Sequence, residues 1–589
     1  MAATEPVSPV PPATPPSAAG GLGGWLDSRT GYRALLGHLL SEPVRGGASF
    51  AYVFGSLLLF VLANQALTGV LLMAFYAPSA TDAWASVAYI QDQVRLGWFI
   101  RGMHSAGASV MVLGMVAHLL QVALFGAYRA PREVSWFSGL FLLLLVLGFA
   151  LTGYLLPWDQ KGYWATQVAT AILGAVPAVG PTLQALLQGG PQYGNLTLTH
   201  FYALHVFVLP TIVIALVIAH VALFRRHGVT PRWGRTEAEL ERRTAPFWPG
   251  QALRDLVAMA VLFAFLAFWV ARTHGAELAA PADPGSRYEA RPEWYFLPLY
   301  QLLKYFPGRL EIVAALAVPA LLILGLLAVP FLDRGRDGAP RRRLLPLLLV
   351  GGSMAGLFAL GFLSTAEDAR NPKYLEGRKR AEEESQRARR LALEGVPVAG
   401  GTAVYLNDPL ERARLLFREH CQGCHKLGTA GPAPEDQKGP DLTGWGTRGW
   451  ISALITDPDH DRAFGRTKLK GGMKAVQLPP ETLADLVEYV YSLGGGGDID
   501  AARAKRGAQI FEDTNCDICH ERDGQSPGQG PGLGGYLSAG WARALLSDPG
   551  SPLYYGKKND MPAFGKKLTG AELDSLAALL QAQRHPKNL

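Results

Sequence analysis

Long apolar stretches recur along the first two thirds of the chain, separated by short polar segments. Seven are long enough to cross a bilayer, since a membrane-spanning helix needs about 20 residues, and they cover residues 50–77, 98–125, 135–157, 201–224, 252–272, 310–332 and 344–363. A further apolar stretch, residues 165–188, is interrupted by Pro177, Gly180 and Pro181 and predicts a pair of short surface helices. The pattern therefore predicts an all-α, seven-span transmembrane bundle.

The remaining segments are polar or compositionally biased. Residues 1–24, rich in Pro, Ala and Gly, predict a disordered tail, and Trp25 to Ser49 predict an amphipathic surface helix. Residues 366–404 are highly charged up to a glycine-containing break and predict a helical linker. Two similar soluble units follow at 405–494 and 498–589, each with one helix near its start and one near its end.

Two of the spans carry paired histidines. His104 and His118 are 14 residues apart, and His205 and His220 are 15 apart. Fourteen residues make nearly four helical turns, so both imidazoles project from one face, about 21 Å apart along the axis. Ionisable groups inside a membrane are costly and are candidates for function. A lone histidine there is more often a hydrogen-bond partner between helices, but two matched pairs favour ligands of two flat, iron-containing macrocycles.

Glycines in the flanking spans repeat at the same interval. Gly55 and Gly69 are 14 residues apart in one span, and Gly139 and Gly153 are 14 apart in another. A bulky ring between helices needs positions without a Cβ, although membrane helices also use small residues for ordinary packing. The shared spacing favours two haems of b type in a four-helix bundle.

Charge sets the predicted orientation. Charged residues make up 17% of the chain, below the roughly 25% of soluble proteins. The net charge of +7 does not indicate nucleic-acid binding, because the arginines cluster beside the apolar spans. With a cytoplasmic N-terminus, the inner loops hold 17 basic residues and the outer loops seven, as the positive-inside rule requires. Seven spans then place the soluble units outside the cytoplasm.

All four cysteines lie in two Cys-x-x-Cys-His motifs, which are typical of covalent c-type haem attachment. The motifs supply Cys421, Cys424 and His425 in the first unit and Cys516, Cys519 and His520 in the second. Each haem iron then needs a sixth ligand. A thioether there suits electron transfer: Met561 is the candidate in the second unit and Met473 in the first, with His460 as a substitute. The alternative for both methionines is a role as core filler.

The segments GYLLPWDQ (residues 153–160), FYALH (201–205) and RPEWY (291–295) resemble cytochrome b of the cytochrome bc-type quinol–cytochrome c oxidoreductases. The resemblance covers roughly residues 30–365. The sequence is similar to the plastoquinol-reductase branch of this family. In that branch cytochrome b is separate from a three-span subunit, and here the two are fused. The soluble units resemble tandem class I cytochrome c. The implied domains are a four-helix haem-binding domain (25–227), a three-helix quinol-site domain (228–365) and cytochrome c domains at 405–494 and 498–589.

The resemblance implies roles for the haem-binding residues. His104 and His205 should ligate an outer haem, and His118 and His220 an inner haem. Arg101 is implied as a further cofactor contact. His200 stands where the family usually has Arg, which leaves the neighbouring propionate contacts open and makes His200 a false ligand candidate.

Two quinone sites are also implied. At the outer one, Glu293 would take a proton from quinol, with Tyr295 and Tyr154 lining the pocket; the alternative for Glu293 is a charge at a helix N-terminus. The inner site is less defined. Arg225 matches a basic residue of the plastoquinol-reductase branch, and Arg254 with Asp255 matches a basic–acidic pair of the other branch. Each is also typical of the basic residues that flank membrane spans on the cytoplasmic side.

The implied function is a respiratory or photosynthetic quinol–cytochrome c oxidoreductase of a bacterial inner membrane. Its cofactors would be two b haems, two c haems and quinone. Its expected partners are a Rieske iron–sulfur protein, membrane lipid, a cytochrome c or terminal oxidase as acceptor, and a second copy of the chain. The alternatives are a passive electron conduit without bifurcation, which the residues at 292–295 disfavour, and a non-catalytic haem-bearing anchor or sensor.

Overall fold

The computed structural model describes residues 21–286, 288–333, 339–495 and 498–585. It forms two compact units, one ending at Arg389 and one beginning at Arg390. Strands β1 (Pro43–Val44) and β2 (Ala245–Pro246) pair antiparallel. All other regular structure among the described residues is helical, so the all-α prediction is confirmed.

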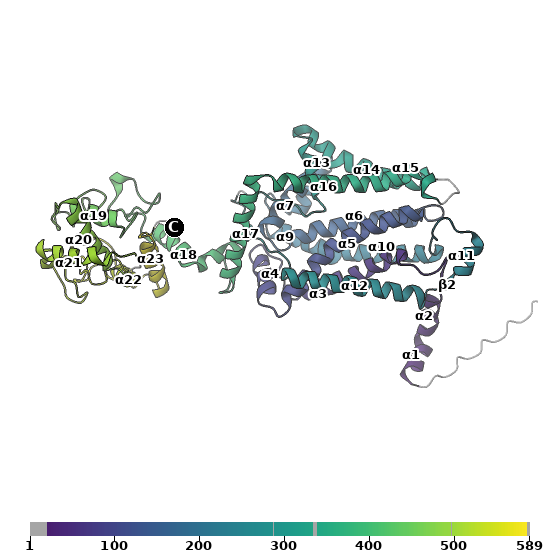
Figure 1. The fold of residues 1–589 in the computed structure, drawn as a ribbon, viewed down its shortest axis with the longest axis horizontal. Helices are drawn as coiled ribbons and strands as arrows, with labels where there is room; N and C mark the ends of the chain where they lie inside the picture. The colour runs from purple at the N-terminus through teal and green to yellow at the C-terminus, as the bar shows by residue number, and fades with distance from the viewer. Residues whose placement is uncertain (1–20, 287, 334–338, 496–497, 586–589) are drawn as a thin grey trace, which may run out of the picture. The chain divides into compact units, whose positions relative to one another are not determined.

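In the described part of the first unit, seven helical spans are long and apolar enough to cross a membrane, and Figure 1 shows α3, α5, α6, α10 and α12 running side by side. In lipid, a helix satisfies every backbone polar group internally. The spans are α3 (Phe54–Met73), α5 (Gly97–Phe125), α6 (Glu133–Leu155), α9 with α10 (Asn195–His227), α12 (Gly250–Thr273), the span ending in α14 (Val313–Leu332), and α15 with α16 (Leu344–Ala369). The seven predicted spans are confirmed, and the chain is a multi-pass membrane protein.

Three of the spans contain a single wider, π-helical turn. In these spans the regular segments are α9 (Asn195–Ala203), α10 (Leu209–His227), α14 (Val318–Leu332), α15 (Leu344–Leu347) and α16 (Ser353–Ala369). The wider turns are Leu204–Val208, Val313–Ala317 and Leu348–Gly352. The first of them includes His205, so one predicted haem ligand sits on a local change of helical pitch, a feature often found at functional sites.

Shorter helices precede, connect and follow the spans. They are α1 (Leu22–Thr30), α2 (Tyr32–Leu40), α4 (Ala83–Asp92), α7 (Gln160–Gly174), α8 (Gly180–Gln188), α11 (Glu237–Arg243), α13 (Leu297–Lys304) and α17 (Pro372–Ala392). Helices α7 and α8 confirm the pair predicted at 165–188. The single helix predicted from Trp25 to Ser49 is wrong, because Gly31 adopts a φ of 63° and separates α1 from α2.

Two other predictions concern polar segments, the N-terminal tail and the charged helix after the last span. Most of the predicted disordered tail, residues 1–20, lies outside the described residues, and Leu22 already begins α1. The charged helix predicted after residue 366 is present as α17, but it starts only at Pro372 because α16 continues to Ala369. Figure 1 shows α17 lying across one end of the bundle. There the hydroxyl of Ser385 accepts a hydrogen bond from the Ala280 N–H at 3.2 Å.

From Pro409 onward, the described residues of the second unit form six α-helices. They are α18 (Pro409–His420), α19 (Arg448–Thr456), α20 (Pro480–Ser492), α21 (Ala501–Asp513), α22 (Ala539–Ser547) and α23 (Gly570–Ala582). Helices α18 and α21 lead directly into the two Cys-x-x-Cys-His motifs. Helix α18 packs against α23, and α20 packs against α21. One continuous apolar core results, which includes Phe417, Leu486, Phe511 and Leu576.

Candidate haem centres and substrate pocket

The first histidine pair, His104 and His205, faces two of the predicted glycines. A Cβ on Gly69 would lie 3.3 Å from Cε1 of His104, and a Cβ on Gly153 would lie 2.6 Å from Cε1 of His205. The two imidazole centroids are 6.3 Å apart. At about 2 Å per metal–nitrogen bond, this separation accommodates one metal ion between the rings. The residues present therefore fit a bis-histidine haem.

The second pair, His118 and His220, repeats the arrangement. A Cβ on Gly55 would lie 3.9 Å from Cε1 of His118, and one on Gly139 would lie 3.4 Å from Cε1 of His220. The structure thus places one glycine of the four against each histidine. Helix α3 supplies both glycines that face α5, and α6 supplies both that face the α9–α10 span.

Three of the four histidines also have a hydroxyl partner that the sequence analysis did not identify. The distances from Nδ1 to the hydroxyl oxygen are 3.0 Å for His104 and Thr68, 3.1 Å for His205 and Thr152, and 2.8 Å for His220 and Ser138. Each hydroxyl donates its own proton to a backbone carbonyl of its helix. It therefore accepts from Nδ1–H, and this tautomer leaves Nε2 free to bind a metal.

The fourth histidine, His118, differs. Its Nδ1 is buried without a hydrogen-bond partner among the described residues. The cause is visible in the sequence, because Phe54 precedes Gly55 where the other three glycines follow Ser or Thr. That Ser/Thr–Gly pairing is the signal that identifies the hydroxyl partners from sequence.

Arg101 and His200 both bond to protein groups. The Arg101 guanidinium donates to Gln91 Oε1 at 2.8 Å and to the Ala276 and Glu277 carbonyls at 2.9 and 2.6 Å. Nδ1 of His200 lies 2.8 Å from the Leu186 carbonyl in α8. Arg101 therefore ties α5 to the segment after α12, and its contact with a cofactor stays a prediction.

The turn after α6 is held by the segment that follows α12. The Ala282 N–H donates to the Trp158 carbonyl at 3.0 Å, and the Ala279 N–H donates to Asp159 Oδ2 at 3.0 Å. Trp158 has a φ of 50°, a left-handed conformation that a bulky residue keeps only when its surroundings enforce it. These contacts hold the end of the GYLLPWDQ segment against residues 279–282, which precede the RPEWY segment in the chain.

Glu293 lies just before α13, where its carbonyl accepts from the Leu297 N–H at 3.2 Å. Burial raises the pKa of its carboxyl group, and the nearby Lys161 ammonium opposes that rise, while the Glu277 and Asp159 carboxylates add to it. Among the described residues no hydrogen bond to the Glu293 carboxylate is present. The carboxyl group is therefore available to a ligand and protonates more readily than an exposed glutamate.

Lys161 forms an ion pair with Glu277, with Nζ and Oε2 2.5 Å apart. The ammonium holds the pKa of Glu277 below its usual value. The Glu277 side chain is 78% exposed, whereas that of Lys161 is 35% exposed. Lys161 thus lies between the half-buried Glu293 and a carboxylate in contact with solvent.

The two predicted tyrosines lie near Glu293. Its charge acts on both Tyr154 and Tyr295, and burial followed by that charge raises the pKa of Tyr295. The Tyr154 hydroxyl is buried and has no hydrogen-bond partner within the described part of the chain. A buried, unpaired hydroxyl requires an explanation, and a bound polar ligand provides one.

Arg225 and Asp255, which are predicted for the inner quinone site, both bond to other protein groups, and their role at that site stays a prediction. Arg225 pairs with Glu42 at 2.5 Å, and Asp255 accepts from Ser56 Oγ at 2.9 Å and from Gln251 Nε2 at 2.8 Å. A cavity of about 540 Å³ near the end of α5 is lined by neither Arg225 nor Asp255. Its lining includes Tyr52, Phe125, Arg232, Trp233 and Arg235.

Both Cys-x-x-Cys-His motifs of the second unit have the same local geometry. His425 Nδ1 lies 2.9 Å from the Pro440 carbonyl, and His520 Nδ1 lies 2.8 Å from the Pro531 carbonyl. A carbonyl acceptor fixes the Nδ1–H tautomer and leaves Nε2 for a metal. The glycine before each of these prolines lies against the imidazole ring. A Cβ on Gly439 would lie 2.5 Å from Cε1 of His425, and a Cβ on Gly530 would lie 2.7 Å from Cε1 of His520. These sites fit covalently attached haem.

Met473 and Met561 are both half-buried against the apolar core of the second unit. His460 is exposed, and its Nδ1 accepts from the Arg462 N–H at 3.1 Å. The surroundings therefore favour the two methionines over His460, and their role as ligands stays a prediction.

Four family models match the chain. Residues 39–228 match "Cytochrome b/b6/petB" and residues 281–377 match "Cytochrome b(C-terminal)/b6/petD". Residues 410–494 match "Cytochrome c", and residues 502–580 match "Cytochrome C oxidase, cbb3-type, subunit III". The matches to cytochrome b and cytochrome c imply haem of both b and c type.

Individual relatives match part of the chain. The cytochrome bc complex cytochrome b subunit of Chlorobaculum thiosulfatiphilum is 38% identical over 323 residues, covering 54% of this chain and 74% of the relative. The menaquinol:cytochrome c reductase cytochrome b subunit of Geobacillus thermodenitrificans is 40% identical over 214 residues, covering 35% and 96%. A chain of a solved "Hyperthermophilic respiratory Complex III" superposes with a TM-score of 0.51 at 27% identity, covering 64% of this chain and 99% of that one.

Proposed function

Because this chain belongs to the cytochrome b family and carries cytochrome c domains at its C-terminal end, we propose that it is the b/c subunit of a membrane quinol–cytochrome c oxidoreductase. The observation that carries the proposal is Glu293, a half-buried carboxyl group without a hydrogen-bond partner among the described residues, beside two tyrosines and an ion pair that leads to solvent.

The histidine pairs and the two Cys-x-x-Cys-His motifs would hold four haems. His104 with His205 and His118 with His220 each supply two Nε2 atoms, and His425 and His520 each supply one. When bound, the haems would supply one-electron carriers, so that a Rieske iron–sulfur partner and the c haems would take one electron of each quinol and the b haems would carry the other to a second quinone. The hydroxyls of Thr68, Thr152 and Ser138 orient their histidines for this task.

Oxidation of one quinol releases two electrons and two protons. Glu293 accepts a proton from a quinol hydroxyl, and its raised pKa brings it nearer to the pH range in which a general base is effective. The Lys161–Glu277 pair then offers a route by which the proton reaches water. The unpaired Tyr154 hydroxyl would orient the quinol ring by hydrogen bonding, and Tyr295 would line the pocket.

The remaining parts of the complex follow from this chemistry. All four cysteines lie in haem-attachment motifs, so in this proposal the iron–sulfur centre would come from a partner subunit. The positive-inside count supports an outer location for the c haems in a bacterial inner membrane, where a cytochrome c or terminal oxidase would accept their electrons. We also expect a second copy of the chain to complete a dimer.

The test uses the purified complex with and without its iron–sulfur partner. A pyridine haemochrome assay should give two b and two c haems per chain. Quinol should reduce the c haems rapidly in the full complex and only at the background rate once the partner is removed. If the c haems are reduced equally fast without the partner, the chain is a passive conduit and the proposal is wrong.

A further inference from the structure

Each half of the second unit repeats one pattern: a helix, a Cys-x-x-Cys-His motif, a second helix, a methionine and a closing helix. Two independent domains would pack α18 against α20 and α21 against α23. The structure instead packs α21 of the second half against α20 of the first, and α18 of the first half against α23 of the second. The opening and closing helices are therefore exchanged between the halves.

The contact between α20 and α21 is close and specific. A Cβ on Gly507 in α21 would lie 1.9 Å from the Asp485 carbonyl oxygen in α20, so no larger residue fits there. Beside it, the Phe511 and Tyr489 rings lie 5.4 Å apart, and Arg506 pairs with Asp485 at 2.7 Å. Few residues of sequence separate Ser492, the end of α20, from Ala501, the start of α21, and a short connection favours antiparallel pairing of neighbouring helices.

The other exchanged pair joins the first haem-attachment motif to the second half. His420, the last residue of α18, directly precedes Cys421, and its ring lies 6.1 Å from that of Phe564. Phe564 is three residues after Met561, in the segment that leads into α23. Ala413 and Phe417 of α18 are buried in the same core as Leu576 of α23. The first motif therefore lies beside the second methionine segment.

The second motif has the reciprocal position. Cys516 follows α21, which packs on α20, and Arg522, just after His520, pairs with Glu512 of α21 at 2.9 Å, next to Phe511, whose ring contacts Tyr489 of α20. Helix α20 is the closing helix that follows Met473. The two methionine segments also touch each other, since Lys468 pairs with Asp560 at 2.6 Å.

We propose that the axial ligands of the two c haems are exchanged between the halves. The first c haem, attached through Cys421 and Cys424 and ligated by His425, would take Met561 as its sixth ligand. The second c haem, attached through Cys516 and Cys519 and ligated by His520, would take Met473. Residues 390–589 contain two methionines in total, one for each haem. The proposal depends on the two haem-attachment motifs and is independent of quinol oxidation.

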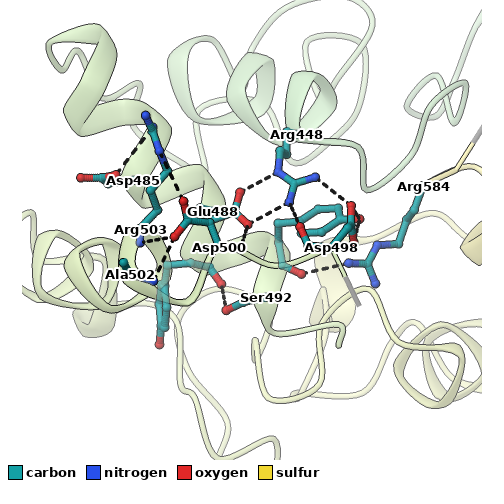
Figure 2. A network of polar contacts seen from close by, with 11 residues as sticks. Arg448, Asp485, Glu488, Ser492, Asp498, Asp500, Ala502, Arg503 and Arg584 are labelled. Carbon is teal, nitrogen blue, oxygen red and sulfur yellow. Dashed lines mark hydrogen bonds and ion pairs between the residues drawn. The ribbon is translucent and has the colours of Figure 1, made fainter. Parts of the chain in front are cut away.

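Figure 2 shows the polar network that fixes the crossing. Arg448, at the start of α19, pairs with Glu488 at 2.6 Å and with Asp498 at 3.1 Å. Arg584, after α23, donates to the Tyr491 carbonyl at 3.0 Å. The two guanidinium groups lie 3.9 and 4.2 Å from the centroid of the Tyr491 ring. The end of the second half is thereby tied to the closing helix of the first.

Exchange has a consequence for the protein as a whole. Neither half contains both axial ligands of its own haem, so neither can form a closed, six-coordinate site alone. Loss of Met473 would open the haem at the second motif, 43 residues after it along the chain, and leave the haem at the first motif closed. Ligation in sequence order predicts the opposite outcome.

The test removes one haem and then one methionine from the full-length chain. With Cys421→Ser and Cys424→Ser in place, the remaining c haem is at the second motif. Met473→Ala should then open it to carbon monoxide, whereas Met561→Ala, the matched control, should leave it closed. With Cys516→Ser and Cys519→Ser in place, the two methionine substitutions should exchange effects. If Met561→Ala opens the haem at the second motif, ligation follows sequence order and the proposal is overturned.

A second measurement keeps both haems and decides the question if a single-haem chain does not fold. Hydrogen peroxide destroys an open haem faster than a closed one, and mass spectrometry of the haem peptides identifies which motif has lost its haem. In Met561→Ala the loss should fall on the peptide with Cys421 and Cys424, and in Met473→Ala on the peptide with Cys516 and Cys519. The reverse assignment would overturn the exchange.

Discussion

Gly153 lies so close to His205 that a Cβ at this position would be 2.6 Å from Cε1 of the imidazole. Such contacts do not occur between real side chains, so the histidine or any group bound to it would have to move. Gly148, on the same helix, has open space around the position of its Cβ. The two glycines thus form a matched pair that separates the effect of a haem site from that of helix propensity.

Gly153→Ala should lower the b-haem content of the chain, because the added methyl group displaces His205 from its ligating position. The pyridine haemochrome ratio of b to c haem measures this, and the covalently attached c haems serve as the internal standard. Gly148→Ala should leave the ratio unchanged. A Gly153→Ala chain with a full complement of b haem would show that the first histidine pair does not hold one.

Thr152→Val should weaken haem binding by about 10- to 100-fold, as other losses of a ligand's hydrogen-bond partner do. The hydroxyl that accepts from His205 Nδ1–H is removed, so the ring loses its fixed tautomer. Haem loss during transfer to apomyoglobin measures the affinity. Thr152→Ser keeps the hydroxyl and should retain wild-type affinity; equal losses in both variants would point to packing instead.

Lys161→Met should move the acid side of the pH profile for quinol oxidation to higher pH. The Lys161 charge opposes the rise in the Glu293 pKa, so its removal raises that pKa further. The carboxylate that accepts the proton then becomes available only at higher pH, while the rate at alkaline pH is retained. Lys373→Met, which removes an exposed lysine paired with Glu289, should not shift the profile. If Lys161→Met leaves the pH profile unshifted, the Lys161 charge does not act on the group that accepts the proton.

Reporter fusions test the orientation. A fusion at Ala238, in the loop that carries seven arginines, should stay in the cytoplasm. A fusion at Ala399, after the seventh span, should be exported. Alkaline phosphatase and green fluorescent protein give opposite readouts on the two sides. Cytoplasmic fluorescence from the Ala399 fusion would mean that the number of spans is not seven.

The features that the sequence alone predicts are those in which residues repeat at helical spacing within one segment. The spans, the histidine pairs and the facing glycines follow from helical repeats within single segments, and the structure places each glycine against a histidine. Lys161 and Glu277 are 116 residues apart, and they meet only because the Trp158 turn pairs with the Ala279–Ala282 segment. No local pattern contains that pairing.

The sequence does not predict the exchange of helices in the second unit, for a different reason. Both halves repeat the same order of elements, so a pattern cannot tell whether α18 belongs with α20 or with α23. The choice depends on particular contacts, such as the close approach of Gly507 to Asp485. The break at Gly31 is a simpler case, because a glycine in a polar segment is compatible with either a helix or a turn.

The most direct test of the proposed function is Glu293→Gln in the complete complex, compared with Glu289→Gln four residues earlier. Both substitutions keep side-chain size, but only the first removes the buried base. The haem ligands lie on other helices, so both variants should contain normal b and c haem. Quinol-dependent reduction of cytochrome c should fall by about 10²- to 10⁴-fold in Glu293→Gln and remain near the wild-type rate in Glu289→Gln. Direct reduction of the c haems by a small artificial donor should be equal in both. A wild-type rate of quinol oxidation in Glu293→Gln would contradict the assignment of the proton-accepting group and of the pocket built around it.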